Sequence, residues 1–422
     1  MSQTNSHIGD RHLLHGSELF ELGPSSQLHF PPSGASVRIV KSPDATAMSA
    51  GFQEGAQTCL CNRQSFQQSS TQIFAGIICH GNNTDDNMQI TPGRLTVTIP
   101  DSCDSIKSMT LKNVTGFEYP EGLSFGDIQV EGTGGPMSLG TLEADTIVWK
   151  SRGGAMNFYK IKANSAAFDM GMGNLEITVL SITQDARFAA SGGDLSITDA
   201  VVASIDIKTS MGNVDIKTLS ATEAAKIKTS GGTLKITDAV VADIGIETSM
   251  GNVDIKALSA TEAAEFLTSG GAIEVDSVRT RSMKASTRMG QSSIRELDAF
   301  NIELDTTGGD ISCLKARSHR RLSIATTMGN VVWKEYRPSS GNVDVKTSGG
   351  RIGMRLAGSV ESRVNIQSTT GDVALLLQPS GEHDFRGVVD ATTSSGRFDT
   401  ERGTSVLANK SRGGGKAVFG RR

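Results

Sequence analysis

Residues 191–268 contain two near-copies of a 39-residue unit, and this internal repeat limits what the chain can fold into. The first copy reads SGGDLSITDAVVASIDIKTSMGNVDIKTLSATEAAKIKT and the second SGGTLKITDAVVADIGIETSMGNVDIKALSATEAAEFLT, with 30 of the 39 positions identical. Each copy divides into two shorter units, one opened by Ser-Gly-Gly and the other by Ser-Met-Gly-Asn. Self-similarity at a fixed short period predicts a repeat architecture in which each unit packs on its neighbours.

Glycines mark these units, and their spacing continues far beyond the two near-copies. We call the last glycine of each corner phrase a marker glycine. Successive markers are 19 to 21 residues apart until the last step, which is 25 residues. The divergent flanks therefore keep the period of the near-identical centre. The markers are Gly116, Gly135, Gly154, Gly173, Gly193, Gly212, Gly232, Gly251, Gly271, Gly290, Gly309, Gly329, Gly350, Gly371 and Gly396.

Between markers, apolar and polar residues alternate with the period of two that is typical of β-strands. Leu195 and Ile197 follow one marker, while Ile205 and Ile207 precede the next. Two such runs in each unit predict two strands per turn, and neither a leucine-rich pattern nor a helical period is present. The sequence therefore predicts an all-β fold, a single-stranded parallel β-solenoid (β-helix) of about 15 rungs of 19–20 residues over residues 90–400.

Stacking the rungs places like residues in columns. Positions five before and two after the markers are apolar, with Ser292 and Glu118 as exceptions. A threonine recurs three residues before the marker and shares the alternation of the apolar residues, so it should point inward. We therefore expect a buried hydroxyl ladder and disfavour an ice-binding surface. These threonines are Thr209, Thr229, Thr248, Thr268, Thr287, Thr306, Thr326, Thr347 and Thr393.

Backbone geometry gives a reason for the corner residues. A tight corner needs a positive φ, which glycine adopts without strain, so the markers are expected in that region. Asn174, Asn213, Asn252 and Asn330 follow markers and could form an asparagine ladder on alternate rungs. No Walker-type or Rossmann-type context surrounds these glycines, so they do not indicate a phosphate-binding loop.

The corner phrases resemble a known family. They read TSMGNVDI at Thr209–Ile216 and Thr248–Ile255, TSGGRI at Thr347–Ile352 and STTGDV at Ser368–Val373. This pattern resembles the adhesin-like domain of bacterial auto-transporters, a Gly-rich β-solenoid repeat family of unknown function. The resemblance covers roughly residues 90–400. It implies a right-handed β-solenoid and an adhesive or surface role, and it supplies no catalytic residues.

The ends of the chain are less regular. Residues 1–89 are expected to form an irregular leader and cap region that includes a strand at Ser36–Val40 and an apolar run at Ile73–Cys79. A strand is also predicted at Arg94–Pro100. Residues 401–422 are basic and rich in glycine, which favours a flexible tail over a nucleic-acid arm.

Composition narrows the partners. With 41 basic and 45 acidic residues the formal net charge is −4, so the overall field does not favour nucleic acid or an anionic membrane. No stretch approaches the ~20 apolar residues of a membrane span. The first residues lack the basic start and apolar run of a signal peptide. Localisation stays open, cytoplasmic by default and extracellular or at the cell surface if a leader has been missed at the N-terminus.

Two sets of residues are candidates for metal binding or modification. Cys59, Cys61, Cys79 and Cys103 match no common zinc spacing, so free thiols, a local disulfide and a metal site all stay open. Sequons begin at Asn82, Asn113 and Asn409 and matter only in a secreted protein.

Two inward residues are expected in the core. Cys313 should be a small buried side chain, and Trp333 should fill a wider rung near Pro338.

Three functions fit these observations. The leading prediction is a non-catalytic structural or adhesin-like protein without cofactor, metal or catalytic residues, which presents a repetitive face to a protein or glycan surface. The second is a bactofilin-like scaffold that self-associates through its solenoid ends, where strand edges are unpaired. The third is a polysaccharide-processing β-helix enzyme, which the mixed outward charges and the scarcity of Tyr and Trp disfavour.

Overall fold

The protein is all-β in the computed structural model, which describes residues 18–20, 27–30, 36–43, 48–53, 61–63, 68–69, 72–74, 77–79, 94–101, 103–132, 134–339, 341–357, 362–378, 387–401, 407–411 and 414–418. The chain forms two compact units, Met1–Ser151 and Arg152–Arg422. Its parallel strands stack into a β-solenoid of about 14 turns, close to the predicted 15. Within the described ranges there is no helix long and apolar enough to span a membrane.

The first unit combines short strands with the first solenoid turns. Strands β3, β9 and β11 pair in parallel, and β4 joins β9 in antiparallel fashion. Strand β10 pairs in parallel with β2 and β12, and β12 with β13. The strands are β1 (Glu18–Phe20), β2 (Gln27–Phe30), β3 (Ser36–Ser42), β4 (Met48–Gln53), β5 (Cys61–Arg63), β6 (Gln68–Ser69), β7 (Gln72–Phe74), β8 (Ile77–Cys79), β9 (Arg94–Pro100), β10 (Ser105–Val114), β11 (Gly116–Glu118), β12 (Ser124–Gly132) and β13 (Met137–Ser151).

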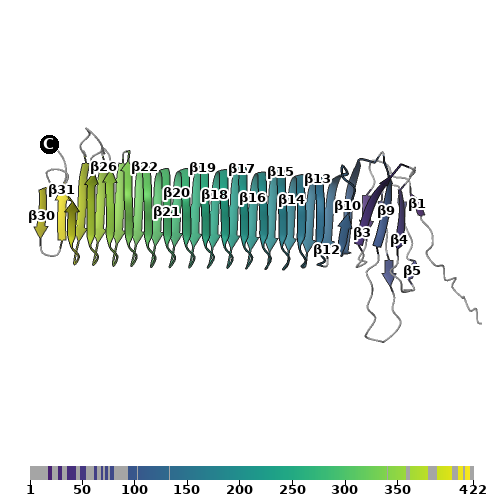
Figure 1. Ribbon diagram of the computed structural model, residues 1–422, viewed down its shortest axis with the longest axis horizontal. Helices are drawn as coiled ribbons and strands as arrows, with labels where there is room; N and C mark the ends of the chain where they lie inside the picture. Colours follow the sequence, from purple (N-terminus) through teal and green to yellow (C-terminus); the bar gives the residue numbers. More distant parts are fainter. Residues whose placement is uncertain are drawn as a thin grey trace, which may run out of the picture. The chain divides into compact units, whose positions relative to one another are not determined.

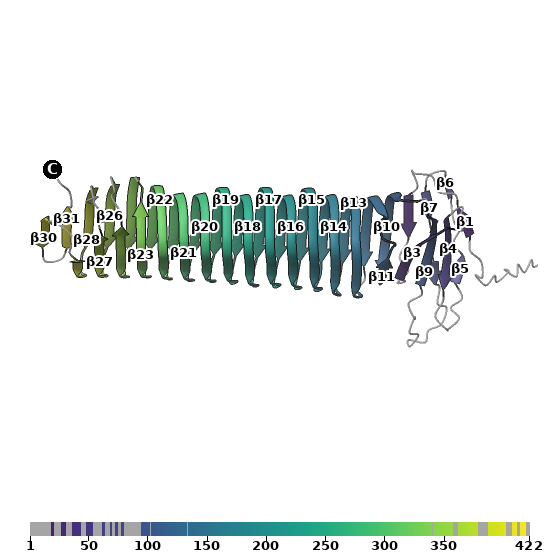
Figure 2. The ribbon, with the colours of Figure 1, turned by 45° about the horizontal axis from the view of Figure 1, so that its top comes forward.

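The second unit is a regular stack of parallel strands (Figures 1 and 2). From β14 to β22 each strand forms most of one turn and pairs with the next strand. The strands are β14 (Met156–Met170), β15 (Leu175–Ala190), β16 (Leu195–Thr209), β17 (Val214–Thr229), β18 (Leu234–Thr248), β19 (Val253–Thr268), β20 (Ile273–Thr287), β21 (Ser292–Thr306), β22 (Ile311–Thr326), β23 (Val331–Pro338), β24 (Gly341–Thr347), β25 (Ile352–Ala357), β26 (Ser362–Ser368), β27 (Val373–Gln378), β28 (Gly387–Thr393), β29 (Phe398–Glu401), β30 (Leu407–Ser411) and β31 (Gly414–Val418).

The prediction of two strands per turn is correct only for the later turns. From β14 to β22 one strand of 15 or 16 residues bends within the ladder. In these strand pairs, except β20 with β21, the register shifts near the middle, for example between Val202 and Ile205. In later turns the halves separate, so β22 pairs with both β23 and β24. The alternation of apolar and polar residues is interrupted at the bend, but the strand itself continues through it.

Burial follows the predicted columns. In β17 the inward residues are Val214, Ile216, Leu219, Ala221, Ala225, Ile227 and Thr229. The spacing widens from two residues to three after Ile216 and to four after Ala221, which are the two bends of the strand. Parallel register then places Ile207, Ile227 and Ile246 in one buried column. Burying each such side chain stabilises the fold by roughly 1.5–3 kcal/mol.

The marker glycines are required for a different reason from the predicted one. Only Gly154 among them has a positive φ, at 85°. A Cβ on Gly251 would instead lie 1.9 Å from the carbonyl oxygen of Gly232, and the same conflict recurs from Gly173 to Gly396. The marker of one turn therefore directs a Cα–H at the carbonyl oxygen of the previous marker, the geometry of a weak hydrogen bond. At the markers from Gly173 to Gly396, close stacking and not backbone handedness excludes every other residue.

The column of threonines is buried and stacked turn on turn as predicted, and its hydroxyls bond the backbone of the corners. Thr248 is 3% exposed and its Oγ1 donates to the Gly251 carbonyl at 2.6 Å. Two turns later the Gly290 amide donates to Thr287 Oγ1 at 2.9 Å. Each hydroxyl thus closes its own corner three residues later and satisfies a buried backbone group. Burial also removes these threonines from any ice-binding surface.

Asparagines after the markers connect successive turns through the backbone. The Asp194 amide donates to Asn174 Oδ1 at 3.0 Å, the Asn213 amide to Asp194 Oδ1 at 2.8 Å, and the Thr233 amide to Asn213 Oδ1 at 2.9 Å. The predicted ladder on alternate rungs is therefore extended by aspartates such as Asp310. Each of these side chains accepts a hydrogen bond from a backbone amide of the next turn. Asn213 and Asn330 also donate from Nδ2 to the aspartate of the previous turn.

Two predicted strands and two predicted core residues are confirmed. Ser36–Val40 lies in β3, and Arg94–Pro100 is β9. Trp333 is 1% exposed and packs edge-on against Tyr336 with ring centroids 5.3 Å apart, and Cys313 is buried. The boundaries at 89/90 and 400/401 stay predictions. Within the predicted tail the structure places an antiparallel hairpin, β30–β31.

We expect Gly251→Ala to lower the free energy of unfolding by about 3 kcal/mol or more, because overpacking against the Gly232 backbone forces the chain to shift. Gly245→Ala is the matched control, since a Cβ there has nothing within 4 Å. Urea denaturation of both variants measures the difference. Equal stability of the two would contradict the close-stacking explanation.

Ser292→Val should stabilise the protein by about 1 kcal/mol. Ser292 is 1% exposed, its Oγ has no hydrogen-bond partner among the described residues, and it stacks between Ile273 and Ile311. Valine removes the unsatisfied hydroxyl and completes the apolar column. A rise in Tm checks this, and an unchanged or lower Tm would show that the hydroxyl is needed.

Candidate binding surface

The cysteines considered as metal ligands are spread over different elements. Cys61 lies opposite Cys79 in the β5–β8 ladder, while Cys59 is outside the described residues. Cys103 is half-buried and its Sγ contacts the Ser105 carbonyl at 3.5 Å. Within the part of the chain that the structure describes, no three His, Cys, Asp or Glu side chains group as metal ligands. Asn82 is likewise outside the described ranges.

Outward side chains form exposed ion pairs both within one strand and between neighbouring turns, as Lys284 and Glu265 do at 2.8 Å. Asp206 lies opposite Lys226 and Asp215 opposite Lys235 in the parallel register. Asp206 nevertheless pairs with Lys208 of its own strand, at 2.8 Å. Exposed pairs of this kind each contribute less than about 1 kcal/mol. They make a solvated face and do not by themselves define a site.

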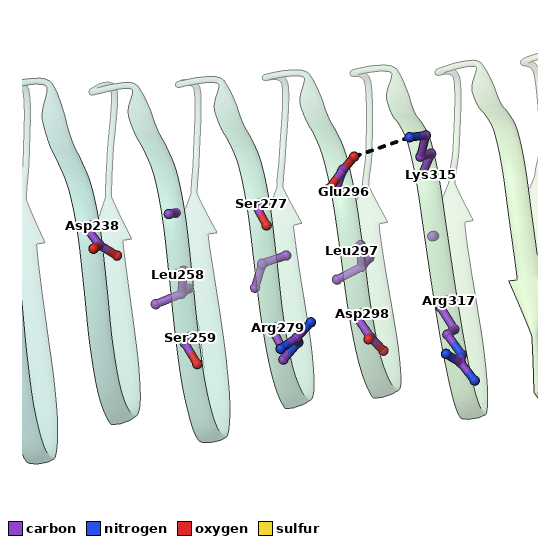
Figure 3. Close-up of a pocket in the computed structure, with 13 residues that line it drawn as sticks. Asp238, Leu258, Ser259, Ser277, Arg279, Glu296, Leu297, Asp298, Lys315 and Arg317 are labelled. Atoms are coloured by element: carbon purple, nitrogen blue, oxygen red, sulfur yellow. Dashed lines mark hydrogen bonds and ion pairs between the residues drawn. The ribbon is translucent and has the colours of Figure 1, made fainter.

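A groove runs along the stack from β18 to β22, where each strand bends (Figure 3). Its volume is about 600 Å³. The floor consists of core side chains that are 2–5% exposed: Leu258, Val278, Leu297 and Ala316. The walls are the outward residues on either side of this floor, so the groove exists because the inward spacing widens at the bend.

The carboxylates of the groove already have basic partners. Glu296 pairs with Lys315 at 3.4 Å, and Asp298 Oδ1 lies 3.0 Å from His319 Nε2 (Figure 3 shows the first pair). Arg279 and Arg317 lie opposite Asp298 on the two neighbouring turns, but Asp298 contacts His319. Arg317 Nε donates to Ser339 Oγ at 3.3 Å. Arg279 has no ion pair with any residue in the described ranges.

Basic residues concentrate around the later half of this groove. We define the basic face as the stretch from five to twelve residues after the marker in the turns of β20–β23. It holds nine basic and four acidic residues, whereas the same stretch of β16–β19 holds two basic and five acidic residues. Its basic residues are Arg279, Arg281, Arg295, Lys315, Arg317, Arg320, Arg321, Lys334 and Arg337.

The basic face also exposes an aromatic ring. Phe300 is 49% exposed, and its ring centroid lies 4.9 Å from that of His319. His319 in turn contacts Asp298 in the groove wall. An apolar ring surface beside guanidinium groups can contact the apolar face of a sugar while the cations contact its anionic substituents.

Sequence reasoning predicted no site residues and did not find this face. The net charge of −4 hides the local excess, because acidic residues of the earlier turns balance it. The sequence does contain a sign of this face. One outward column has an arginine on three of four successive turns: Arg279, Asp298, Arg317 and Arg337. The groove itself could not be found, because it depends on how far the strand bends.

Comparison with known proteins identifies a family. The model of the Toastrack DUF4097 family matches residues 66–237 and 233–401, two consecutive matches that share residues 233–237. No curated protein and no solved structure matches the chain. The matched residues cover most of the chain, including the groove and the basic face.

Burial predicts that Cys313 will resist alkylation. Burial raises the pKa of the Cys313 thiol to about 12, although a contact with the Lys315 carbonyl at 3.4 Å acts in the opposite direction. Because the thiolate is the reacting form, iodoacetamide at neutral pH should label native Cys313 roughly a thousandfold more slowly than the unfolded chain. Mass spectrometry of the Cys313 peptide measures both rates. Equal rates would contradict the buried position.

Proposed function

The chain belongs to the Toastrack DUF4097 family, and from this premise we propose that it is a non-catalytic, adhesin-like scaffold whose basic face binds a linear anionic glycan. A repetitive β-solenoid fits a scaffold role. The observation that carries the finer proposal is the concentration of nine basic residues on four successive turns.

The groove chemistry supports binding over catalysis. Glycoside hydrolysis needs a carboxylic acid that can donate a proton and a second carboxylate across the scissile bond. Glu296 and Asp298 lie on one strand, and both are held by basic partners, Lys315 and His319. Each carboxylate is therefore already engaged by a neighbouring side chain, which suits holding a ligand's hydroxyl groups better than acting as one of two carboxylates across a scissile bond.

The spacing of the arginines suits a linear repeating polyanion. Arg279 and Arg317 occupy the same column two turns apart, about 9.6 Å at the spacing of parallel strands. This is comparable with the length of a disaccharide, so a glycan with one carboxylate per disaccharide can reach both guanidinium groups. Arginine forms bidentate hydrogen bonds with such carboxylates.

End-to-end assembly receives less support. Strand β31 of the C-terminal hairpin contacts β28, the last long strand of the second unit. A second copy could extend the stack at this end only after that hairpin moves. Self-association through the ends therefore stays the weaker proposal.

The double variant Arg279→Glu/Arg317→Glu should weaken binding to hyaluronan, which carries one carboxylate per disaccharide, by roughly tenfold or more. Lys217→Glu/Lys256→Glu changes the charge equally on the acidic turns and should bind like the unchanged protein. Isothermal titration at two salt concentrations measures both, and binding should fall as salt screens the arginines.

Three results would contradict the proposal. They are absence of binding to hyaluronan, equal loss in both double variants, and equal affinity for single-stranded DNA. Release of reducing ends from hyaluronan or another polysaccharide would instead establish an enzyme.

A further inference from the structure

Five methionines project from one corner of the second unit, and the proposed function does not use them. They are spaced by 39 residues without exception and are 70–79% exposed. Other methionines of this unit, such as Met156 and Met283, are fully buried. We call the exposed set the methionine ladder: Met172, Met211, Met250, Met289 and Met328.

Glycines occupy the same position on the intervening turns: Gly192, Gly231, Gly270, Gly308 and Gly349. Backbone bonds confirm the stacking, since the Met250 amide donates to the Ser230 carbonyl and the Gly270 amide to the Ser249 carbonyl. The residues just before the ladder positions are small and uncharged at nine of the ten corners, Arg288 being the exception. The corner is thus a row of apolar projections separated by shallow depressions.

The fold requires neither the methionines nor these glycines. A Cβ on Gly270 would meet only the Ser249 carbonyl oxygen, at 3.7 Å, in contrast to the marker glycines. The equivalent position is Thr370 or Ser395 in later turns. Since the methionine side chains are mostly in solvent, they contribute little to the core. Repeated exposure of large apolar side chains in one row marks an interaction surface.

We propose that the methionine ladder is the interface of an antiparallel dimer with a second copy of this chain. A two-fold axis perpendicular to the stack, between the corners of Met250 and Gly270, places every methionine over a glycine. Met172 then lies over the partner's Gly349, Met211 over the partner's Gly308, and Met250 over the partner's Gly270. The remaining pairs follow by symmetry. Both copies use the same surface, so assembly ends at the dimer.

A parallel dimer cannot make these contacts. Its two-fold axis would run along the stack and place each methionine over the same methionine of the partner. Shifting one copy by one turn along the stack would place methionine over glycine again. That arrangement is no longer symmetric, so further copies could add without limit. Only the antiparallel arrangement combines closure with complementary shape over all ten corners.

The charges beside the ladder agree with the antiparallel arrangement. Three residues before each ladder position, the column contains Asp169, Lys208, Lys228, Glu247, Asp305 and Lys346 as its charged members. The two-fold axis faces Asp169 with the partner's Lys346 and Lys208 with the partner's Asp305. No like charges meet in this column. In the parallel arrangement Asp305 would face the partner's Asp310.

The surface is large enough for a stable dimer. Ten corners span nine steps of about 4.8 Å, so the ladder is about 43 Å long. At ~3.3 Å per residue, a strip that reaches three residues to either side of the ladder is about 20 Å wide. Over the length of the ladder it covers about 860 Å², slightly more than the ~800 Å² per partner of a standard interface. A groove of about 440 Å³ lies beside the ladder from Asp169 to Glu247 and can receive the partner's flanking residues.

The oligomeric state of the full chain tests the proposal. Sedimentation velocity should show a dimer, and Met211→Glu/Met250→Glu/Met289→Glu should raise its dissociation constant by roughly tenfold or more. The control triple Val201→Glu/Val240→Glu/Leu314→Glu replaces exposed apolar residues elsewhere and should stay dimeric. Circular dichroism confirms that both triples are folded. A monomer at the highest soluble concentration, open-ended polymers, or an unaffected dimer would overturn the proposal.

Orientation has its own test. Asp305→Lys should weaken the dimer because it faces the partner's Lys208, and adding Lys208→Asp should restore it. In a parallel dimer Asp305→Lys would face the partner's Asp310 and strengthen association. Strengthening by the single variant, or no rescue by the double variant, would overturn the antiparallel arrangement. Gly270→Met fills the depression that receives Met250 and should weaken the dimer without removing any methionine.

Discussion

The stack depends on the close approach of one marker glycine to the carbonyl oxygen of the marker before it. The approach is so short that a Cβ at Gly212 would lie 1.8 Å from the Gly193 oxygen. Thr209 and its equivalents close each corner from inside, while Asn213 and its equivalents connect successive corners from outside. The corner therefore fixes both the length of a turn and the position of the next one.

Because the corner residues determine how the turns stack, the outward residues can differ from one turn to the next. Inward columns hold apolar residues and the small hydroxyl residues threonine and serine, so they vary little between turns. Outward columns contribute under about 1 kcal/mol for each ion pair and can carry different chemistry on different turns. The basic face of β20–β23 and the methionine ladder both use this freedom, on different sides of the same turns.

The sequence allowed the fold to be predicted in some detail. Alternation placed Ile207, Thr209 and Cys313 inward, and the marker period aligned turns whose other residues differ. It gave the wrong reason for the marker glycines, because φ and close approach both favour glycine and cannot be separated in a sequence. The sequence also predicted two short strands where the structure has one long strand. A bend within a strand interrupts the alternation of apolar and polar residues, although the backbone pairing continues.

What the sequence determined by itself is the turn: its length, its inward residues and its number of repeats, because burial and stacking act on each turn in the same way. The tertiary structure was needed to show how far each strand bends, and therefore which outward columns border one groove. Arg279 and Arg317 are 38 residues apart, and Met172 and Met211 are 39 apart, yet each pair lies two turns apart on one surface. Register and bend angle set these neighbours, and neither is a property of a single residue.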